Sequence, residues 1–152
     1  ILREFKGVSD RLELVREVDE ISYINDTTAT NPTAVIAALK HFGDDKDVVL
    51  IAGGMNKVNE DTDYDELVEE IVLAAKHVIL FEGTASDHIE KKIDGRVPVE
   101  KGIKTMKDAV QKAHTASVKG DSVLLSPGGS SFNLFKNEFD RGEQFREEVR
   151  NL

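Results

Sequence analysis

Residues 122–137 read SVLLSPGGSSFNLFKN, an apolar run that leads into a turn rich in glycine and hydroxyl groups. The apolar run predicts a buried strand, and Ser130 or Ser131 is suited to cap a helix that follows. Glycines let a backbone approach a ligand closely, and the N-terminus of a helix attracts anions. The same residue types also make an ordinary turn and cap. The junction therefore predicts an anion site only where other loops converge on it.

Apolar strands alternate with amphipathic helices along the whole chain. The sequence predicts strands at residues 21–24, 48–52, 78–81 and 122–125, with a short one at 97–99. It predicts helices after the cap at 30–32, from the capping-box-like pair Asp63 and Glu66, at 84–93, after Thr105, around 132–135, and at 140–152.

Strands separated by helices imply right-handed crossovers between parallel strands. The expected fold is therefore α/β: a three-layer, Rossmann-like domain whose mostly parallel sheet of five to six strands carries helices on both faces. Residues 1–20 are expected to form a lead-in or hinge, with a possible interdomain contact at 7–13. The domain proper is expected at 21–152.

Composition narrows the class of protein. The chain has 152 residues, a formal charge of −9 and no cysteine. Such acidity argues against nucleic-acid binding, and the lack of cysteine excludes disulfides and thiolate metal sites. No apolar run approaches the roughly 20 residues that span a bilayer, and the first residues do not resemble a signal peptide. We expect a cytoplasmic monomer with no membrane partner and, since no methionine begins it, a fragment of a longer protein.

Four polar loops follow predicted strands, at residues 25–31, 53–57, 82–84 and 126–137. In an open parallel sheet such loops leave from one edge, where ligands bind. Lys57 offers a cation beside glycines, while Thr30 and Ser131 offer hydroxyl groups; together these suit a small polyanion. Asp26 would suit a sugar hydroxyl, an ammonium group or a metal-bound water.

Plainer interpretations stay open for each of these residues. Asp26 and Thr30 also suit a turn and a cap, Gly53-Gly54 a tight turn, and Lys57 a solvated surface position. The four histidines share no metal-ligand spacing, and the acidic run at residues 60–66 lacks the glycine of a calcium loop. We therefore predict no metal site. The chain contains no G-x-G-x-x-G after a strand, no G-x-x-x-x-G-K-[ST] and no G-x-S-x-G, which argues against dinucleotide, ATPase-loop and esterase chemistry.

Three blocks of sequence resemble the C-terminal domain of the Mur ligases, nearest to the members that add D-glutamate. They are NDTTATNP at 25–32, GGMNK at 53–57, and the stretch at 124–145 that ends in RGEQF. The resemblance implies one domain of an ATP-driven ligase that joins D-glutamate to UDP-N-acetylmuramoyl-L-alanine through an acyl phosphate, in peptidoglycan synthesis. It also implies that ATP and Mg²⁺ are held mainly by domains outside this chain, so that the fragment alone is inactive.

The resemblance also assigns roles to residues. Thr30, Lys57, Ser131 and Phe132 would contact D-glutamate. Asp26, Arg11 and Asn25 would contact the nucleotide as the domains close. The supporting loop residues would be Gly53, Gly54, Ser126, Gly128, Gly129, Lys136 and Asn137.

The chain departs from the family pattern at three positions. Thr28 stands where many relatives have lysine, Asp10 where histidine is usual, and Glu138 where an aromatic residue is common. Two alternatives stay open: another Mur or folylpolyglutamate-type ligase domain, or a doubly wound binding module without chemistry of its own.

Overall fold

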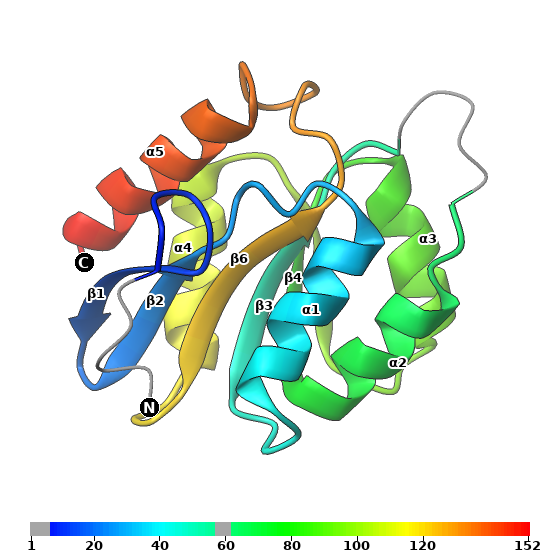
Figure 1. The fold of residues 1–152 in the computed structure, drawn as a ribbon, viewed down its shortest axis with the longest axis horizontal. Helices are drawn as coiled ribbons and strands as arrows, with labels where there is room; N and C mark the ends of the chain where they lie inside the picture. The colour runs from blue at the N-terminus through cyan, green and yellow to red at the C-terminus, as the bar shows by residue number, and fades with distance from the viewer. Residues whose placement is uncertain (1–6, 57–61) are drawn as a thin grey trace.

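The computed structural model describes residues 7–56 and 62–152, and its described elements alternate as expected (Figure 1). The strands are β1 (Glu13–Val18), β2 (Ile21–Asn25), β3 (Val48–Gly53), β4 (Ala75–Phe81), β5 (Val99–Ile103) and β6 (Ser122–Gly128). The helices are α1 (Pro32–Phe42), α2 (Asp65–Ala74), α3 (Thr84–Ile93), α4 (Met106–Ala116) and α5 (Glu138–Arg150). Among the described residues, no helix has the length and apolar character needed to cross a membrane.

The six strands form one sheet in the order β1-β2-β6-β3-β4-β5. Every neighbouring pair is parallel except β1 and β2, which pair antiparallel. This confirms the expected α/β fold with a mostly parallel sheet. The sequence did not predict β1, which lies within residues 1–20. Its hairpin turns at Asp19 and Glu20, both with positive φ, so the glycine that usually marks such a turn is missing.

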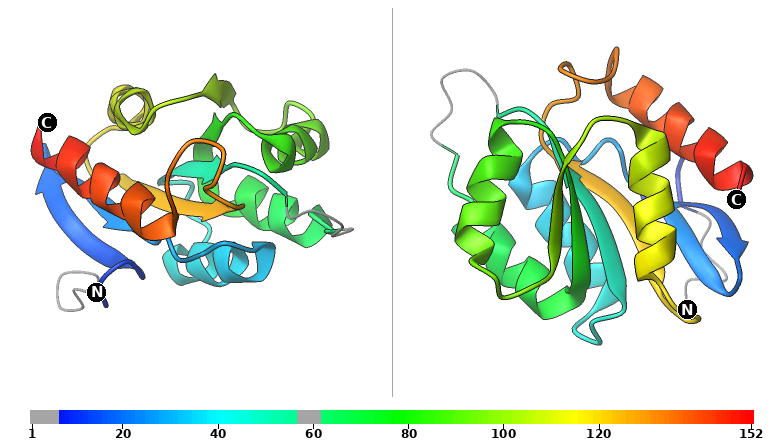
Figure 2. Two further views of the ribbon diagram at one scale, coloured as in Figure 1. Left: turned by 90° about the horizontal axis from the view of Figure 1, so that it is seen from above. Right: turned by 180° about the vertical axis from the view of Figure 1, so that it is seen from behind.

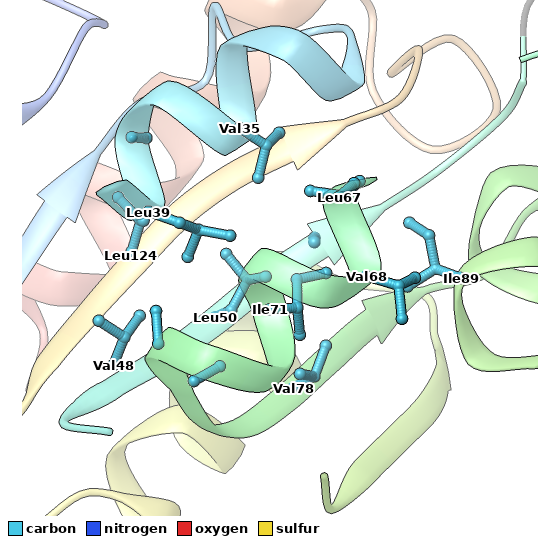
Figure 3. Close-up of a cluster of buried hydrophobic side chains, with 14 of the residues drawn as sticks. Val35, Leu39, Val48, Leu50, Leu67, Val68, Ile71, Val78, Ile89 and Leu124 are labelled. Atoms are coloured by element: carbon cyan, nitrogen blue, oxygen red, sulfur yellow. The ribbon is translucent and has the colours of Figure 1, made fainter. Parts of the chain in front are cut away.

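Strict alternation along the buried strands separates two apolar layers. Val48 and Leu50 of β3 face the layer of α1, α2 and α3, whereas Val49 and Ile51 face that of α4 and α5. Figure 3 shows Val48 and Leu50 among side chains from α1 and α2. Figure 2 shows α4 and α5 on the opposite side of the sheet from α1. Such two-sided burial explains why the strands read as continuous apolar runs.

Three local expectations were wrong. No helix forms at 132–135: a single turn closes there, where the Ser131 carbonyl accepts from the amides of Leu134 and Phe135. Ser130 and Ser131 therefore cap no helix; Asn137 caps α5 instead, accepting from the Asp140 amide at 2.8 Å. α5 thus begins at Glu138 rather than at residue 140.

Helix α2 and strand β5 also differ from expectation. Helix α2 begins without a side-chain cap, because Asp63 accepts from the Asp65 amide in a local turn rather than forming a capping box with Glu66. Strand β5 begins at Val99, the residue where the predicted strand ended.

Candidate functional site at the carboxyl edge of the sheet

The structure brings together the loops that follow β2, β3, β4 and β6. The Met55 amide donates to the Ser130 carbonyl at 3.1 Å, and the Ser130 amide donates back to Met55 at 2.9 Å. The Gly128 amide donates to the Ala29 carbonyl at 2.8 Å, and the Asn56 amide to the Thr84 hydroxyl at 3.0 Å. These bonds make one connected rim from segments that lie far apart in the sequence.

Two glycines in this rim are needed for close packing of backbone against backbone. A Cβ on Gly83 would lie 2.1 Å from the Gly54 carbonyl oxygen, and one on Gly54 would lie 2.5 Å from that of Ser130. Both residues also have positive φ, which L side chains rarely adopt. The structure thus accounts for Gly54 by contact between the backbones of neighbouring loops.

We call the first depression in the rim the hydroxyl pocket. Its volume is about 540 Å³, and it is lined by Thr30, Met55, Asn56, Ser130, Ser131, Phe132 and Glu138. Ser131 is buried, whereas Phe132 is exposed at 74% of its surface. Glu138 is the one charged residue among the described lining residues. Lys57, the cation expected here, lies outside the described residues.

A second depression, the Asp26 hollow, lies across the same loop. Its volume is about 360 Å³, and it is lined by Arg11, Leu12, Asp26, Thr28, Ala29, Ala34, Ala37, Ala38 and His41. The loop at 26–31 therefore separates the two depressions, with Thr28 on one and Thr30 on the other. Alanines form much of the wall, and Arg11 and Asp26 supply opposite charges.

Asp26 is buried and firmly held at the base of its hollow. One carboxylate oxygen accepts from the Ser126 hydroxyl at 2.8 Å and the other from the Leu12 amide at 3.1 Å. Burial is the largest influence and raises the pKa of Asp26, while these two hydrogen bonds and the nearby Arg11 charge partly oppose it. A carboxylate keeps further acceptor positions after two such bonds.

Asn25 is completely buried and lines neither depression. Its amide nitrogen donates to Asp10 at 3.2 Å and to Glu13 at 3.1 Å, and its oxygen accepts from the Thr27 amide at 3.2 Å. The structure thus shows Asn25 tying the end of β2 to the segment before β1.

The remaining predicted residues lie in or near the rim and have different surroundings. Ser126 bonds to Asp26, Asn137 caps α5, and Lys136 is exposed without lining either depression. Gly53, Gly128 and Gly129 lie where β3 and β6 end, and Gly53 pairs with Gly128 in the sheet register.

Sequence reasoning missed Arg141 as a structural centre of the site. This side chain is 1% exposed and donates to the Thr27 hydroxyl at 3.0 Å, the Thr27 carbonyl at 2.9 Å and the Gly129 carbonyl at 3.2 Å. Burial lowers the pKa of Arg141 to about 10, opposed by the nearby charge of Glu138, so the guanidinium stays protonated at neutral pH. The RGEQF block contained this residue, but its partners follow β2 and β6.

A second missed group lies between the segment before β1 and helix α5. Arg146 donates through Nη1 to Asp10 and to Glu13, both at 2.9 Å, and through Nη2 to Glu143 at 2.8 Å. Gly142 lets α5 approach, since a Cβ there would lie 2.5 Å from Asp10 Oδ1. Asp10 and Leu12 have φ of +66° and +45°, unusual for residues with side chains.

Within residues 7–56 and 62–152, no group of three or more histidine, aspartate or glutamate side chains could hold a metal ion. The two adjacent depressions offer hydroxyl groups, the buried Asp26 carboxylate, the Glu138 carboxylate and the Arg11 guanidinium. This donor set suits binding and orienting of anionic or sugar-bearing molecules.

Comparison with known proteins points in one direction. A family model described as "Mur ligase, glutamate ligase domain" matches residues 10–129. The chain is 45% identical to the UDP-N-acetylmuramoylalanine–D-glutamate ligase of Roseiflexus sp. strain RS-1, over 95% of this chain and 31% of that one. It is 42% identical to the enzyme of the same name from Salinibacter ruber, over 99% of this chain and 32% of that one. The chain thus spans about a third of these relatives' length.

Solved structures share the fold at lower identity. A murein peptide ligase from Psychrobacter arcticus has a TM-score of 0.65 at 21% identity, over 99% of this chain and 32% of that one. A folylpolyglutamate synthase/dihydrofolate synthase from Yersinia pestis, solved with AMPPNP and a manganese ion, has a TM-score of 0.56 at 17% identity, over 81% of this chain and 29% of that one. At such identities the likeness shows the fold alone.

Proposed function

The chain belongs to the Mur ligase, glutamate ligase domain family, and we propose that it serves as the amino-acid-binding domain of a longer, ATP-dependent ligase that joins D-glutamate to UDP-N-acetylmuramoyl-L-alanine. The observation that carries this proposal is the similarity, along nearly the whole chain, to relatives named for that reaction. The proposal includes a cytoplasmic, monomeric enzyme of peptidoglycan synthesis whose isolated fragment is inactive.

The hydroxyl pocket is the proposed site of D-glutamate. This amino acid carries two carboxylates, which the hydroxyl groups of Thr30 and Ser131 are suited to bind as hydrogen-bond donors. Lys57 follows directly after the pocket residue Asn56 in sequence and is the proposed counter-charge. Phe132 and Met55 offer apolar surface for the methylene groups. Two anchored carboxylates would fix the direction in which the amine faces, which is the contribution that positioning makes to such a reaction.

The Asp26 hollow is the proposed contact with the nucleotide. ATP would supply the phosphoryl group that activates the acceptor carboxylate. The Arg11 guanidinium suits a phosphate, and the unused acceptor positions of Asp26 suit ribose hydroxyls. Alanine side chains leave room for a flat ring against α1. Mg²⁺ would be held outside the described residues of this chain, which offer no cluster of ligands for it.

The reaction can be tested on the purified full-length protein. ADP release is measured with ATP, Mg²⁺ and UDP-N-acetylmuramoyl-L-alanine, with either D-glutamate or L-glutamate added. We expect release that depends on D-glutamate and not on the L-enantiomer. A response to L-glutamate with a folate acceptor would favour the folylpolyglutamate alternative. No response to any amino acid would favour the inert binding module and contradict the proposal.

Two pocket variants test the assigned residues. Thr30→Val and Ser131→Ala should each raise KM for D-glutamate about tenfold or more, because a bound carboxylate loses a donor and such bonds contribute about 1.5–3 kcal/mol. KM for ATP should stay within twofold. Thr115→Val and Ser117→Ala are matched controls in and just after α4, where the hydroxyls donate only to the carbonyls of the preceding turn. Equal KM values for pocket and control variants would contradict the assignment.

A further inference from the structure

We propose that Arg146 is a positioning residue for the nucleotide side of the site. Through Asp10 and Glu13 it holds residues 8–13 against α5, and it thereby sets Arg11 and Leu12 at the Asp26 hollow. The functional part of this inference rests on the proposed function, whereas the positioning itself does not.

Arg146 joins three carboxylates from two distant parts of the chain. Its Nη1 donates to both Asp10 Oδ1 and Glu13 Oε2 at 2.9 Å, and its Nε and Nη2 donate to Glu143 Oε2 at 3.0 and 2.8 Å. The Asp10, Glu13 and Arg146 side chains are 12%, 22% and 14% exposed, so they are largely shielded from water. Ion pairs shielded in this way hold their geometry better than solvated ones.

The charges explain why this contact is needed. Asp10 and Glu13 accept from the same Arg146 nitrogen and from the same Asn25 nitrogen, so their carboxylate oxygens lie close together. Two like charges at such short range repel, and Asn25 is neutral. Without the guanidinium, residues 8–13 would lose their ion pairs to α5, and repulsion between the two carboxylates would distort the segment.

The segment at 8–13 is in turn connected to the Asp26 hollow by three hydrogen bonds. The Leu12 amide donates to Asp26 Oδ1 at 3.1 Å. The Thr28 amide and hydroxyl donate to the Asp10 carbonyl at 3.2 and 3.0 Å. Thr28 is therefore in direct contact with the backbone of Asp10. Displacement of the segment would remove bonds from both Asp26 and Thr28, and would move Arg11, which lies between Asp10 and Leu12.

The hydroxyl pocket is supported by Arg141, five residues earlier in α5. Asn25 links this support to the segment, because it donates to Asp10 and accepts from the Thr27 amide. The three hydrogen bonds of Arg141 itself go to Thr27 and Gly129, and none of them involves residues 8–13. Loss of Arg146 should therefore affect the Asp26 hollow and leave the hydroxyl pocket in place. This asymmetry separates a positioning role from general loss of stability, which would weaken both ligands together.

The test compares Arg146→Met with Arg150→Met in the full-length protein. Arg150 is a matched control because it lies one turn later in α5 and its side chain is 62% exposed; among the described residues, that side chain pairs only with Glu143, at 3.9 Å. For Arg146→Met we expect amide hydrogen exchange in residues 8–13 to rise at least tenfold. We also expect KM for ATP to rise about tenfold, with KM for D-glutamate within twofold. Arg150→Met should change none of the three.

Asp10→His, combined with Arg146→Met, tests the cause. Replacing one carboxylate by histidine removes the repulsion, so the double variant should recover most of the protection and most of the ATP affinity. Unchanged exchange in Arg146→Met, or a rise in both KM values alike, would overturn the inference. If the wild-type protein shows no D-glutamate-dependent activity, the proposed function fails, and the exchange measurement still decides whether Arg146 holds the segment.

Discussion

Burial shifts the pKa values of two charged residues of this site in opposite directions: it lowers that of Arg141 and raises that of Asp26. Arg141 keeps its charge inside the protein because two carbonyls and one hydroxyl surround it, even though burial lowers its pKa to about 10. Burial raises the pKa of Asp26, and the hydrogen bonds from Ser126 and Leu12 offset only part of that shift. Both residues occupy the rim, where geometry for a ligand and stability of the fold compete.

Arg141→Lys should lower the free energy of unfolding by about 1.5–3 kcal/mol, because an ammonium group cannot reach three acceptors fixed by a planar guanidinium. Urea unfolding of the wild-type and variant proteins measures this loss. Arg150→Lys, at an exposed position of the same helix, should stay within about 0.5 kcal/mol. A loss at Arg141 as small as that at Arg150 would show that the buried bonds contribute little.

Asp26→Asn should become more stable relative to wild type as the pH rises. The fold favours the protonated form of Asp26, since burial raises its pKa, so this group's contribution to stability falls as the pH rises through that raised pKa. Below the ordinary aspartate pKa of about 4, the wild-type residue is neutral in both states and the advantage disappears. Urea unfolding at pH 3.5 and pH 7 gives the difference, with exposed Glu147→Gln as control. A difference that is constant with pH would contradict the argument.

The same Asp26→Asn variant should also raise KM for ATP, because Asp26 is a proposed contact with the nucleotide.

At the scale of residues, the sequence predicted the positions of those that lie in loops after a strand. Thr30, Ser131 and Asp26 lie at the carboxyl edge because parallel strands deliver their loops there. Arg141 and Arg146 could not be found in this way. Thr27, a partner of Arg141, lies 114 residues earlier in the chain, and Asp10, a partner of Arg146, lies 136 residues earlier. A charged residue in a helix pattern reads as solvated surface until such neighbours are known.

At the scale of elements, helix α5 supports both depressions. Its first residue, Glu138, lines the hydroxyl pocket, its second turn bonds to the loops after β2 and β6, and its third turn bonds to residues 8–13. Helix α5 was expected, but its start was placed two residues late because the cap residue Asn137 was assigned to the loop. Strand β1 was missed because its hairpin lacks glycine and its burial is partial.

Gly83→Ala should lower the free energy of unfolding by about 1–3 kcal/mol more than Gly120→Ala, because overpacking against fixed backbone adds that much. Both glycines have positive φ, but a Cβ at Gly83 meets the Gly54 carbonyl at 2.1 Å, whereas one at Gly120 meets nothing within 4 Å. The pair therefore separates steric contact from backbone strain. Equal losses in urea unfolding would mean that the loops after β3 and β4 move apart without cost.

At the scale of the whole molecule, the carboxyl and amino ends of the parallel strands carry different features. The carboxyl edge carries the two depressions, while the amino edge holds Lys76 and Asp121 in an ion pair at 2.7 Å, with Asp121 6% exposed. The sequence predicted the α/β architecture with helices on both faces of the sheet, because strand and helix periods determine both, but it did not predict the ion pair at the amino edge. It could not predict the volumes of the depressions, which depend on how the loops pack against each other.

Lys76→Met should lower the free energy of unfolding by about 1–3 kcal/mol, because it leaves the buried Asp121 carboxylate without its cation. KM for ATP and for D-glutamate should not change, since the pair lies at the far edge. Lys119→Met removes an exposed pair with Glu20 and should cost less than about 1 kcal/mol. Thermal unfolding and steady-state kinetics together check both statements. A changed KM would show that the edges are energetically coupled.

The loop at 26–31 acts as a partition with a chamber on either side, since Thr28 and Ala29 line one and Thr30 the other. Because one stretch of backbone forms the wall of both, the loop cannot be lengthened for one ligand alone. Inserting a residue would change the size of both chambers at once. Selectivity for one of the two ligands can therefore be changed only by substituting side chains. A single inhibitor that spans this loop would contact Asp26, Thr28 and Ala29 on one side and Thr30 on the other.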